Sequence, residues 1–559
     1  MSKKLIALLL AAMMMLSLAA ACGNDAPTET PTQPSTPAET PTTPAAPTTP
    51  APTEPADPDA DKYGGDLVVA TSYVSNTLDP HNVNGVMANY QWMQYIFEVP
   101  LAHGADGQVY PLICDYEQSE DGLTLKLTVR EYYFHNGNRV TAEDVMASFE
   151  RAAVLNSSFQ SKHWGNVVDK TIEGDTITLK LAALDVNLLW DIADSKGPCY
   201  ILPKSLCEKY SGGALIEDIK ELVGTGPYML ESYRPDTAIK MIRNENYVVT
   251  ENAVDGPAAP RKAYCDTITY AVNTDSASLT AAMIAGDYHV GSIMSSMQAY
   301  AEQIGLKRTL LENQWTHAIF FNLHESNADS PVADGNFRKA FRAALDMNAI
   351  MLSVMSGDST RYVLNCSPVT PLNTAYYNNI LESTEWNIAD KELAKQYLAK
   401  TNYNGEPIVW LCSSGSAFYR AAMAAIPMLE EVGINVELQT VDSGSHSGLR
   451  GDPANGHDIG AWETQKAIPN PVGQNNFVIG SAGGWWENTK KTELVEILKT
   501  TPTGSEASVQ AYKDFCQLVA DEVPWIGFGT GLTATYTQPN VELNYQGIMS
   551  YYWNAYFTK

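Results

Sequence analysis

The region between residues 406 and 441 has a strand–helix–strand pattern that restricts the fold classes open to this chain. EPIVWLC (406–412) is a short apolar run typical of a buried strand, and INVELQTV (434–441) predicts a second strand. Between them, AFYRAAMAAIPMLEEV (417–432) repeats apolar residues at helical spacing, and Gly433 supplies a C-terminal stop. Two strands joined by one helix at this spacing form a parallel crossover unit, so at least one part of the chain is α/β.

Three further segments predict strands, and one predicts a well-capped helix. GGDLVVATSYV (64–74) is a glycine turn followed by a strand, whereas GLTLKLTVR (122–130) and TITLKLA (176–182) alternate as half-buried strands do. TAEDVMASFERAA (141–153) predicts a helix with one apolar face. Thr141 is followed three residues later by an aspartate, which is the spacing of a capping box, so we expect the helix to begin there.

Size, charge and cysteine spacing exclude several classes of protein. At 559 residues the chain exceeds what one hydrophobic core usually covers, so two or more lobes are expected. The formal charge of −28 argues against a nucleic-acid partner, whose phosphates require a basic surface. The 8 cysteines form no C-x-x-C pair, so they signal neither a zinc site nor a redox pair. Cys199 and Cys207 are close enough for a local disulfide, and buried free thiols are the alternative.

The first residues have the features of a secretory signal. Two lysines precede an apolar run from Leu5 to Leu18, and small residues lead to Cys22. A membrane-spanning anchor is the alternative, but the run is short for a hydrocarbon layer of about 30 Å. The end of the segment resembles a bacterial lipoprotein signal, in which the cysteine is lipidated and becomes the new N-terminus, although Ala19 stands where that pattern usually has leucine. We therefore expect a signal peptide over residues 1–21 and lipidation at Cys22, which would hold the protein on the membrane.

Residues 22–62 are expected to form a tether behind this cysteine. From Ala26 to Pro58 the sequence is almost entirely Pro, Thr, Ala and Glu, which cannot bury a core and favours an extended polyproline II path. At about 3.1 Å per residue this stretch could reach on the order of 100 Å. A folded domain over residues 63–559 would then work well away from the bilayer.

Five motifs, taken in order along the chain, carry a resemblance to a known family. They are LDPHNVNGV (78–86), FHNGNRVTAEDVMASFERA (134–152), GTGPYML (224–230), RNENY (243–247) and PVADGNFRKAFRAALD (331–346). Each motif is weak alone, but their order and spacing resemble the family 5 solute-binding proteins of ABC importers, which are dipeptide, oligopeptide and nickel binders. The second motif departs from the family pattern at Asn136, where an aspartate is usual.

The resemblance implies an α/β fold of the type II periplasmic-binding-protein class, of the peptide-binder kind. It has two lobes, a third smaller domain inserted between their segments, and two hinge crossovers. The solute is trapped between the lobes, which close on it by a hinge motion. The approximate boundaries implied are 63–88, 200–278 and 505–559 for lobe 1, 89–199 for the inserted subdomain and 279–504 for lobe 2.

The same resemblance implies a function and a location. The chain would act as a monomer without a cofactor and would capture a small, peptide-like solute. It would deliver that solute to the transmembrane permease subunits of an ABC importer. With its lipid anchor, it would reside on the outer face of the bacterial cytoplasmic membrane, and the many Tyr and Trp residues would be available to line the cleft.

Most residues of the family motifs have a structural interpretation. Phe134 and Gly137 are expected to set a turn before the Thr141 helix, and Gly224 to Tyr228 is expected to form a tight turn. Asp334 and Arg338 are expected to cap a helix and to pair at its start. These motifs therefore identify the family through residues that stabilise its fold, and we expect the ligand contacts to come from other segments.

The segment GAWETQKAIPNPVG (460–473) is the principal candidate for binding the solute. In the peptide binders of the family it reads Gly-Trp-x-x-Asp, and the aspartate pairs with the α-amino group of the peptide. Trp462 keeps the aromatic residue, which we interpret as cleft floor in preference to plain core. Gln465 stands in the place of the aspartate, and Glu463 is the only acid in the segment. We expect a solute without a free amine, or a peptide whose amine is met by Glu463; Lys466 would suit a carboxylate or phosphate if it points inward.

The loop Asn84, Gly85 and Val86 is the second candidate for contact with the solute. It follows LDPH at the place where peptide binders of this family contact an extended ligand. An ordinary loop that links the lobes is the alternative interpretation.

Other functions have less support in the sequence. A secreted hydrolase would need a motif such as G-x-S-x-G or H-E-x-x-H, and neither occurs; SGSHSG (443–448) reads as a flexible loop without the rigid support that a nucleophile needs. An adhesin would leave the family resemblance unexplained. No bare-metal site is predicted, because the histidines come from unrelated segments: His135, His317, His324 and His457. A chelated metal or an oligosaccharide stays open as the solute.

Overall fold

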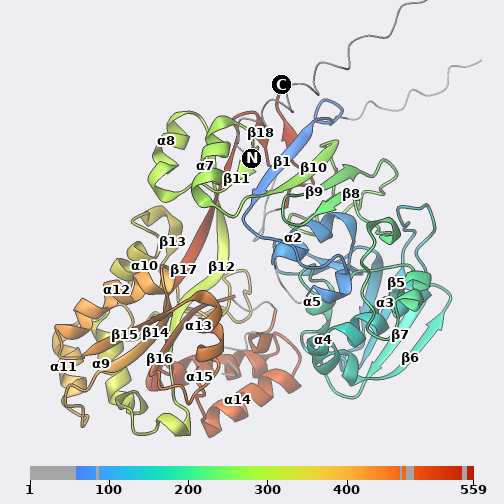
Figure 1. Ribbon diagram of the computed structural model, residues 1–559. Helices are drawn as coiled ribbons and strands as arrows, with labels where there is room; N and C mark the ends of the chain where they lie inside the picture. Colours follow the sequence, from blue (N-terminus) through green and yellow to red (C-terminus); the bar gives the residue numbers. More distant parts are fainter. Residues whose placement is uncertain (1–57, 84–86, 253, 466–468, 474–483, 544–550) are drawn as a thin grey trace, which may run out of the picture. The chain divides into compact units, whose positions relative to one another are not determined.

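The largest sheet among the described residues has eleven strands and is shared by distant parts of the chain (Figure 1). The computed structural model describes residues 58–83, 87–252, 254–465, 469–473, 484–543 and 551–559, all within the unit Pro58–Lys559. The strand order is β15 (Val436–Val441), β14 (Ile408–Ser413), β16 (Ile459–Gln465), β12 (Lys307–Phe321), β17 (Trp525–Thr537), β11 (Val290–Gly291), β1 (Asp66–Thr71), β10 (Thr267–Val272), β9 (Ala238–Arg243) and β8 (Tyr228–Arg234), and β13 (Tyr362–Val363) pairs with β17 off this path.

The part of the sheet around β1 joins segments that lie far apart in the sequence. β1 pairs in parallel with β10, with Asp66 opposite Thr267, whereas β10, β9 and β8 are antiparallel neighbours. Leu67 and Val69 of β1 are buried in a first hydrophobic cluster, as the alternation of a strand requires. The strand predicted in residues 64–74 is therefore confirmed over the shorter range of β1.

A second sheet of four antiparallel strands is formed by residues that precede β8 in the sequence. Its order among the described residues is β4 (Cys114–Gln118), β5 (Thr124–Val129), β7 (Thr176–Leu181) and β6 (Val167–Glu173). β5 and β7 confirm the two strands predicted from alternation. Their apolar residues, for example Leu127, are buried in the first hydrophobic cluster.

Helix α3 (Ala142–Leu155) packs in the same cluster and begins where the sequence predicts. The Asp144 backbone N–H donates to Thr141 Oγ1 at 3.3 Å, and the Thr141 N–H donates to Asp144 Oδ2 at 2.9 Å, which completes the capping box. The predicted turn before it is also present, because the Phe134 N–H donates to the Asn138 carbonyl at 2.9 Å and Gly137 has a φ of 83°.

Strands β14 and β15 and the helix between them, α12 (Ala417–Glu430), form the predicted parallel crossover unit. The two strands are parallel, with Ile408 opposite Val436. Gly433 has a φ of 93°, a left-handed conformation that suits the end of a helix. Ala422 and Leu429 of α12 are buried in a second hydrophobic cluster together with Trp410 of β14.

This second cluster gathers helices from the C-terminal half of the chain. They are α9 (Gly335–Ala344), α10 (Met347–Val354), α11 (Lys391–Leu398), α14 (Thr489–Thr500) and α15 (Glu506–Glu522). Tyr512 of α15 is fully buried in it, whereas the boundaries inferred from the sequence place residues 505–559 in the first lobe.

A third, small cluster covers the strands between the two larger ones. It contains Leu279 and Met283 of α7 (Ser276–Ala285), together with Ala534 and Tyr536 of β17. The other helices and strands are α2 (Met87–Ile96), α4 (Ser157–Lys162), α5 (Leu188–Ile192), α6 (Lys204–Lys209), α8 (Gln298–Gln303), α13 (Ser443–Arg450), β2 (Leu101–His103), β3 (Val109–Pro111), β18 (Val541–Glu542) and β19 (Tyr556–Phe557).

The glycines of the predicted turn at Gly224 to Tyr228 are required by close packing. A Cβ atom on Gly224 would lie 1.9 Å from the Ile96 carbonyl oxygen, and one on Gly226 would lie 2.3 Å from that of Tyr95. Both contacts would be with backbone atoms at the end of α2, which cannot move aside as the end of a flexible side chain could. The Gly226 N–H donates to the Ile96 carbonyl at 2.9 Å, so the turn also satisfies a helix-terminal carbonyl.

Two local predictions are wrong. Residues Ser443–Arg450 form α13 instead of a flexible loop, because Asp442 caps them by accepting from the Gly444 and Ser445 N–H groups at 3.0 Å. Asp334 caps α9 as predicted, but the Arg338 side chain donates to backbone carbonyls, among them those of Glu522 and Val523, instead of to that aspartate.

The cysteines and the membrane question can be stated for the described residues alone. Cys199 and Cys207 are buried free thiols, so the structure supports the alternative to a local disulfide between them. None of the described helices has the length and apolar character needed to cross a bilayer. The predicted signal peptide, Cys22 and most of the tether lie outside the described residues.

Candidate functional site

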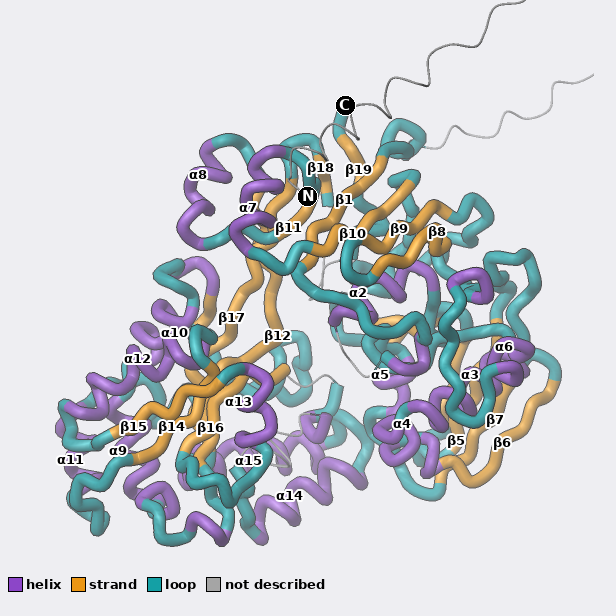
Figure 2. The backbone as a smooth tube through the Cα atoms, in the orientation of Figure 1, coloured by secondary structure: helices purple, strands orange, loops and turns teal. Residues whose placement is uncertain are grey.

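Two long strands connect the part of the sheet around β1 with the part around β14, and the candidate site lies along them. β12 and β17 are antiparallel neighbours from Lys307 opposite Thr537 to Phe320 opposite Trp525, and Figure 2 shows them running side by side. Residues at one end of this pair belong to the third cluster, and residues at the other end belong to the second. The pairing is irregular between Leu311 and Trp315 and again between His317 and Ala318, so the two crossovers form one ribbon with two irregularities.

Strand β16 places the three predicted residues of segment 460–473 beside this ribbon. In the antiparallel pairing of β16 with β12, Trp462 lies opposite Ala318, Glu463 opposite His317, and Gln465 opposite Trp315. The structure therefore puts the backbone of all three residues next to the crossover. Their side chains, and Lys466 as a whole, lie outside the described residues.

Asn84, Gly85 and Val86 also lie outside the described residues, but the chain on both sides of them is placed. Before them comes a single 3-10 turn, Pro80–Asn82, and α2 begins at Met87 directly after them. Whether this loop meets β16 around one solute is therefore still a prediction.

The aspartate of the LDPH motif fixes the chain before this loop through a buried ion pair. Asp79 Oδ1 accepts from Arg151 Nη1 of α3 at 2.9 Å, and the second guanidinium nitrogen binds Asp79 Oδ2. Both side chains are buried. The Ile216 N–H donates to Asp79 at 2.9 Å, and the Arg151 side chain donates to the Tyr210 and Ala214 carbonyls at 3.0 and 2.9 Å. Two of the family motifs are thus one structural unit, as the structural interpretation of these motifs predicts.

His317, which lies opposite Glu463 in the pairing, is buried and neutral. Burial, assisted by the charge of Arg420, lowers its pKa to about 4. Its ring contacts Phe418 of α12 with centroids 5.9 Å apart. At neutral pH, β12 therefore places no positive charge opposite Glu463 at this position.

Three glycines of β17 allow neighbouring backbone or side-chain atoms to approach this strand closely, and the sequence interpretation missed them. A Cβ atom on Gly527 would lie 2.7 Å from the Cys366 Cβ, and one on Gly529 would lie 2.9 Å from the Val363 carbonyl oxygen. On Gly531 it would lie 2.8 Å from His317 Nε2. Their alternation in GFGTG (527–531) was the available signal, because glycine at every second position of a strand marks a close approach.

The histidines named in the sequence analysis lie in separate places. His135 accepts from the Gly224 N–H beside the turn before α3, and His317 is on β12. The rings of His324 and His457 both contact the ring of Trp485. Within the described ranges there is no group of three or more His, Cys, Asp or Glu side chains placed to hold a metal ion.

Comparison with known proteins identifies the family. The model of the bacterial extracellular solute-binding proteins, family 5 Middle, matches residues 108–487. The oligopeptide-binding protein AppA from Bacillus subtilis is 23% identical over 445 residues, which covers 73% of this chain and 76% of AppA. The glutathione-binding protein GsiB from Salmonella typhi is 22% identical over 482 residues, which covers 82% of this chain and 88% of GsiB.

Solved structures show the same fold. The ABC transporter substrate-binding protein CtaP from Listeria monocytogenes superposes with a TM-score of 0.73 at 16% identity, covering 89% of this chain and 100% of CtaP. AppA in complex with a nonapeptide gives a TM-score of 0.68 at 20% identity, covering 89% of this chain and 100% of AppA. These neighbours are type II periplasmic binding proteins, and the α/β architecture predicted from the sequence is confirmed. The chain therefore belongs to the family 5 bacterial extracellular solute-binding proteins of ABC importers.

Proposed function

We propose that the protein is the lipid-anchored receptor of an ABC importer for a peptide-like solute. It captures the solute between two lobes, acts as a monomer and delivers the solute to the permease on the outer face of the bacterial cytoplasmic membrane. One observation carries the proposal: the β12–β17 ribbon runs from the second hydrophobic cluster to the third, next to the part of the sheet around β1, and β16 pairs Trp462, Glu463 and Gln465 with that ribbon. A hinge next to the candidate residues suits capture by closure of the lobes.

The relatives support transport over catalysis and leave the solute open. AppA is described as an oligopeptide-binding protein and GsiB as a glutathione-binding protein, so both bind molecules built with peptide bonds. Both are substrate-binding transport proteins, which favours a receptor over the secreted hydrolase. For this chain, the solute contacts we propose are Asn84, Gly85, Val86, Trp462, Glu463 and Gln465, with no metal among them.

The experiment that tests this function is mass spectrometry of the molecule that copurifies with the protein under native conditions. We expect one small solute at about one equivalent, and the same solute, added back to stripped protein, should raise the melting temperature by several degrees. A receptor returns its solute unchanged, whereas a hydrolase would convert it. Conversion of the added molecule, or the absence of stabilisation by any copurifying molecule, would argue against the proposal.

Lipidation at Cys22 is a separate part of the proposal with its own test. In the bacterial host, the wild-type chain should be cleaved before Cys22 and found in the membrane fraction, because two or more acyl chains give stable anchoring. Cys22→Ser should leave the membrane fraction or accumulate unprocessed. The matched control is Cys265→Ser, which removes a buried thiol of the folded domain and should leave the distribution unchanged. A mature wild-type chain that starts elsewhere and lacks acyl mass contradicts this part.

A further inference from the structure

The segment after β7 connects the two large hydrophobic clusters without belonging to the ribbon. Leu181, at the end of β7, and Leu188, at the start of α5, are both buried in the first cluster. Val186, which lies between them, packs against the second cluster. We call residues 184–187 the bridging segment, because its two ends are fixed in one part of the molecule and its middle touches the other.

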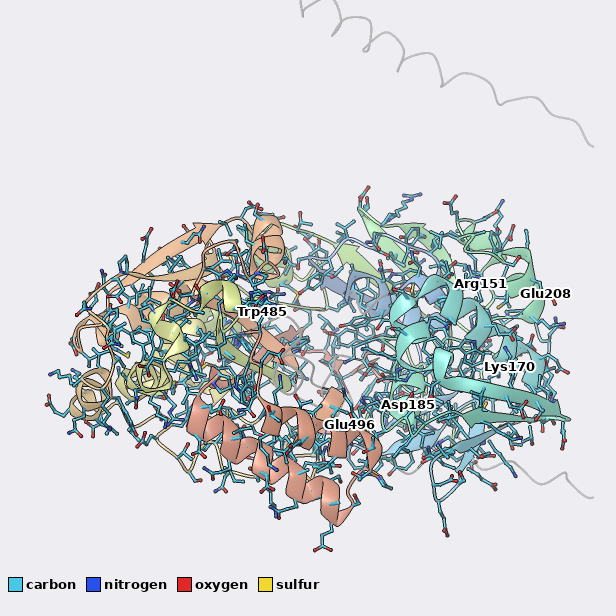
Figure 3. All side chains as sticks on the ribbon, turned by 90° about the horizontal axis from the view of Figure 1, so that it is seen from below. Arg151, Lys170, Asp185, Glu208, Trp485 and Glu496 are labelled. Carbon is cyan, nitrogen blue, oxygen red and sulfur yellow. The ribbon has the colours of Figure 1, made fainter. Side chains whose placement is uncertain are left out.

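The bridging segment faces a defined surface of the second part. A Cβ atom on Gly473 would lie 3.7 Å from Asn187 Oδ1, a buried oxygen without a hydrogen-bond partner among the described residues. A cavity of about 300 Å³ beside this contact is lined from one side by Leu184, Asp185 and Val186. From the other side it is lined by Pro469, Pro502 and Thr503. In the view of Figure 3, Asp185 lies near Glu496 of α14, the helix that directly precedes Pro502 and Thr503 in the sequence.

One buried histidine, His163, contacts the bridging segment at Asp185 and the following helix α5 at Asp191. We call these two contacts the clamp. His163 Nδ1 lies 2.8 Å from Asp185 Oδ2, and its Nε2 lies 2.7 Å from Asp191 Oδ2 of α5. Only 5% of the His163 side chain is exposed. Because both ring nitrogens face carboxylate oxygens, both must donate, which requires the imidazolium form. Phe159 of α4 contacts the ring with centroids 5.8 Å apart.

We propose that the bridging segment is a second contact between the part of the molecule built on the first hydrophobic cluster and the part built on the second, remote in sequence from both crossovers, and that His163 is the residue that positions it. The clamp fixes Asp185 directly beside Val186, so loss of the clamp releases the contact with the second cluster. The contact restricts the rotation that the ribbon allows and so influences how the lobes capture any solute. The inference concerns the lobes alone and can fail while the proposed function holds.

The charge of the clamp gives it a defined pH range. Burial opposes protonation of His163, but the two aspartates outweigh it and raise its pKa to about 9. Asp185 and Asp191 are the titratable groups that face the ring; Lys162 precedes it on its own helix, and Lys170 lies over the neighbouring Trp164. Because the pKa of the folded state is raised, the stabilisation is complete below the ordinary value of 6.5 and is lost as the pH rises through about 9.

The test is hydrogen exchange of the full chain without added solute, measured by mass spectrometry and corrected for intrinsic rates. His163→Gln should accelerate exchange about tenfold or more in peptides covering residues 182–192 and, across the contact, in those covering 469–473. Val186→Asp should accelerate exchange in 469–473 and leave 157–166 unchanged. In the wild type, exchange in peptides 182–192 and 469–473 should accelerate by the same factor as the pH rises through about 9. His163→Gln should show no such pH-dependent acceleration.

A matched control separates the clamp from a general loss of stability. His135→Gln makes the same substitution at a half-buried histidine, which bonds the Gly226 carbonyl, and should leave exchange in 469–473 unchanged. If His163→Gln does not fold, Asp191→Asn replaces it, because it removes one of the two charges and keeps an oxygen acceptor. Unchanged exchange in 469–473 for both His163→Gln and Val186→Asp would overturn the contact. A response to Val186→Asp alone would overturn the role of His163.

Discussion

Replacing Arg151 by methionine should lower the free energy of unfolding by about 3–5 kcal/mol, because it leaves Asp79 as a buried carboxylate without its cation. The substitution also removes the donors to the Tyr210 and Ala214 carbonyls. Burial opposes ionisation of Asp79, but the hydrogen bonds and charge of Arg151 hold its pKa below the ordinary value. The contribution is therefore present at neutral pH and is lost as the pH falls through the lowered pKa.

Urea unfolding followed by circular dichroism measures this effect, and Arg139→Met is the matched control. Arg139 forms an equally short pair with Asp175, 2.8 Å long, but the two side chains are 39% and 47% exposed. Loss of this surface pair should have a much smaller effect than loss of the buried pair, because solvent screens the two exposed charges. Equal effects of the two substitutions would show that the Asp79–Arg151 pair is not what joins the two motifs. The double variant Arg151→Met with Asp79→Leu should recover part of the loss, because no unpaired charge then remains buried.

Gln465→Asp should create binding of short free-amine peptides that the wild type lacks. In the resemblance on which this rests, an aspartate at this position neutralises the α-amino group of the peptide. Glutamine can accept a hydrogen bond but cannot supply the charge, and a buried ammonium left unpaired costs about 2–5 kcal/mol. That energy corresponds to weakening by a factor of about thirty to several thousand, enough to bring a micromolar peptide to roughly millimolar affinity.

A panel of di- to pentapeptides in a thermal-shift assay is the measurement. The wild type should show no shift, and Gln465→Asp should gain one for at least part of the panel. Gln439→Asp makes the same change on the exposed strand β15, away from the ribbon, and should gain nothing. If the wild type binds peptides tightly and Glu463→Gln reduces that binding, Glu463 meets the amine in place of the aspartate. Tight binding by the wild type that Glu463→Gln leaves intact refutes the argument.

Local elements of the fold could be predicted because their information lies within a few residues. The capping box of α3 needs only Thr141 and Asp144, and the parallel crossover of β14, α12 and β15 needs one continuous stretch. α13 was missed because glycine and serine have weak helix propensity, and the Asp442 cap outweighs it. Arg338 was misjudged because the carbonyls of Glu522 and Val523, which it binds, lie far away in the sequence.

The candidate site could be predicted only as far as the family pattern reaches. Trp462, Glu463 and Gln465 were identified from one segment, and the structure places that segment on a strand at the crossover. The residues that surround them on β12 and β17 come from two other regions, and no spacing connects these regions before the chain is folded. His163 escaped notice for the same reason, because its two partners follow it by 22 and 28 residues and share no motif with it.

The pairing of β12 with β17 has a mechanical consequence. Two independent linkers could bend separately, but two hydrogen-bonded strands bend together. The register of this pairing shifts at two places on β12, between Leu311 and Trp315 and between His317 and Ala318. Paired strands bend most easily where their regular hydrogen bonding is broken, so bending can be concentrated at these two places while the residues between and beyond them stay paired. The pairing of the two crossovers therefore favours bending at these two places over independent movement of either strand.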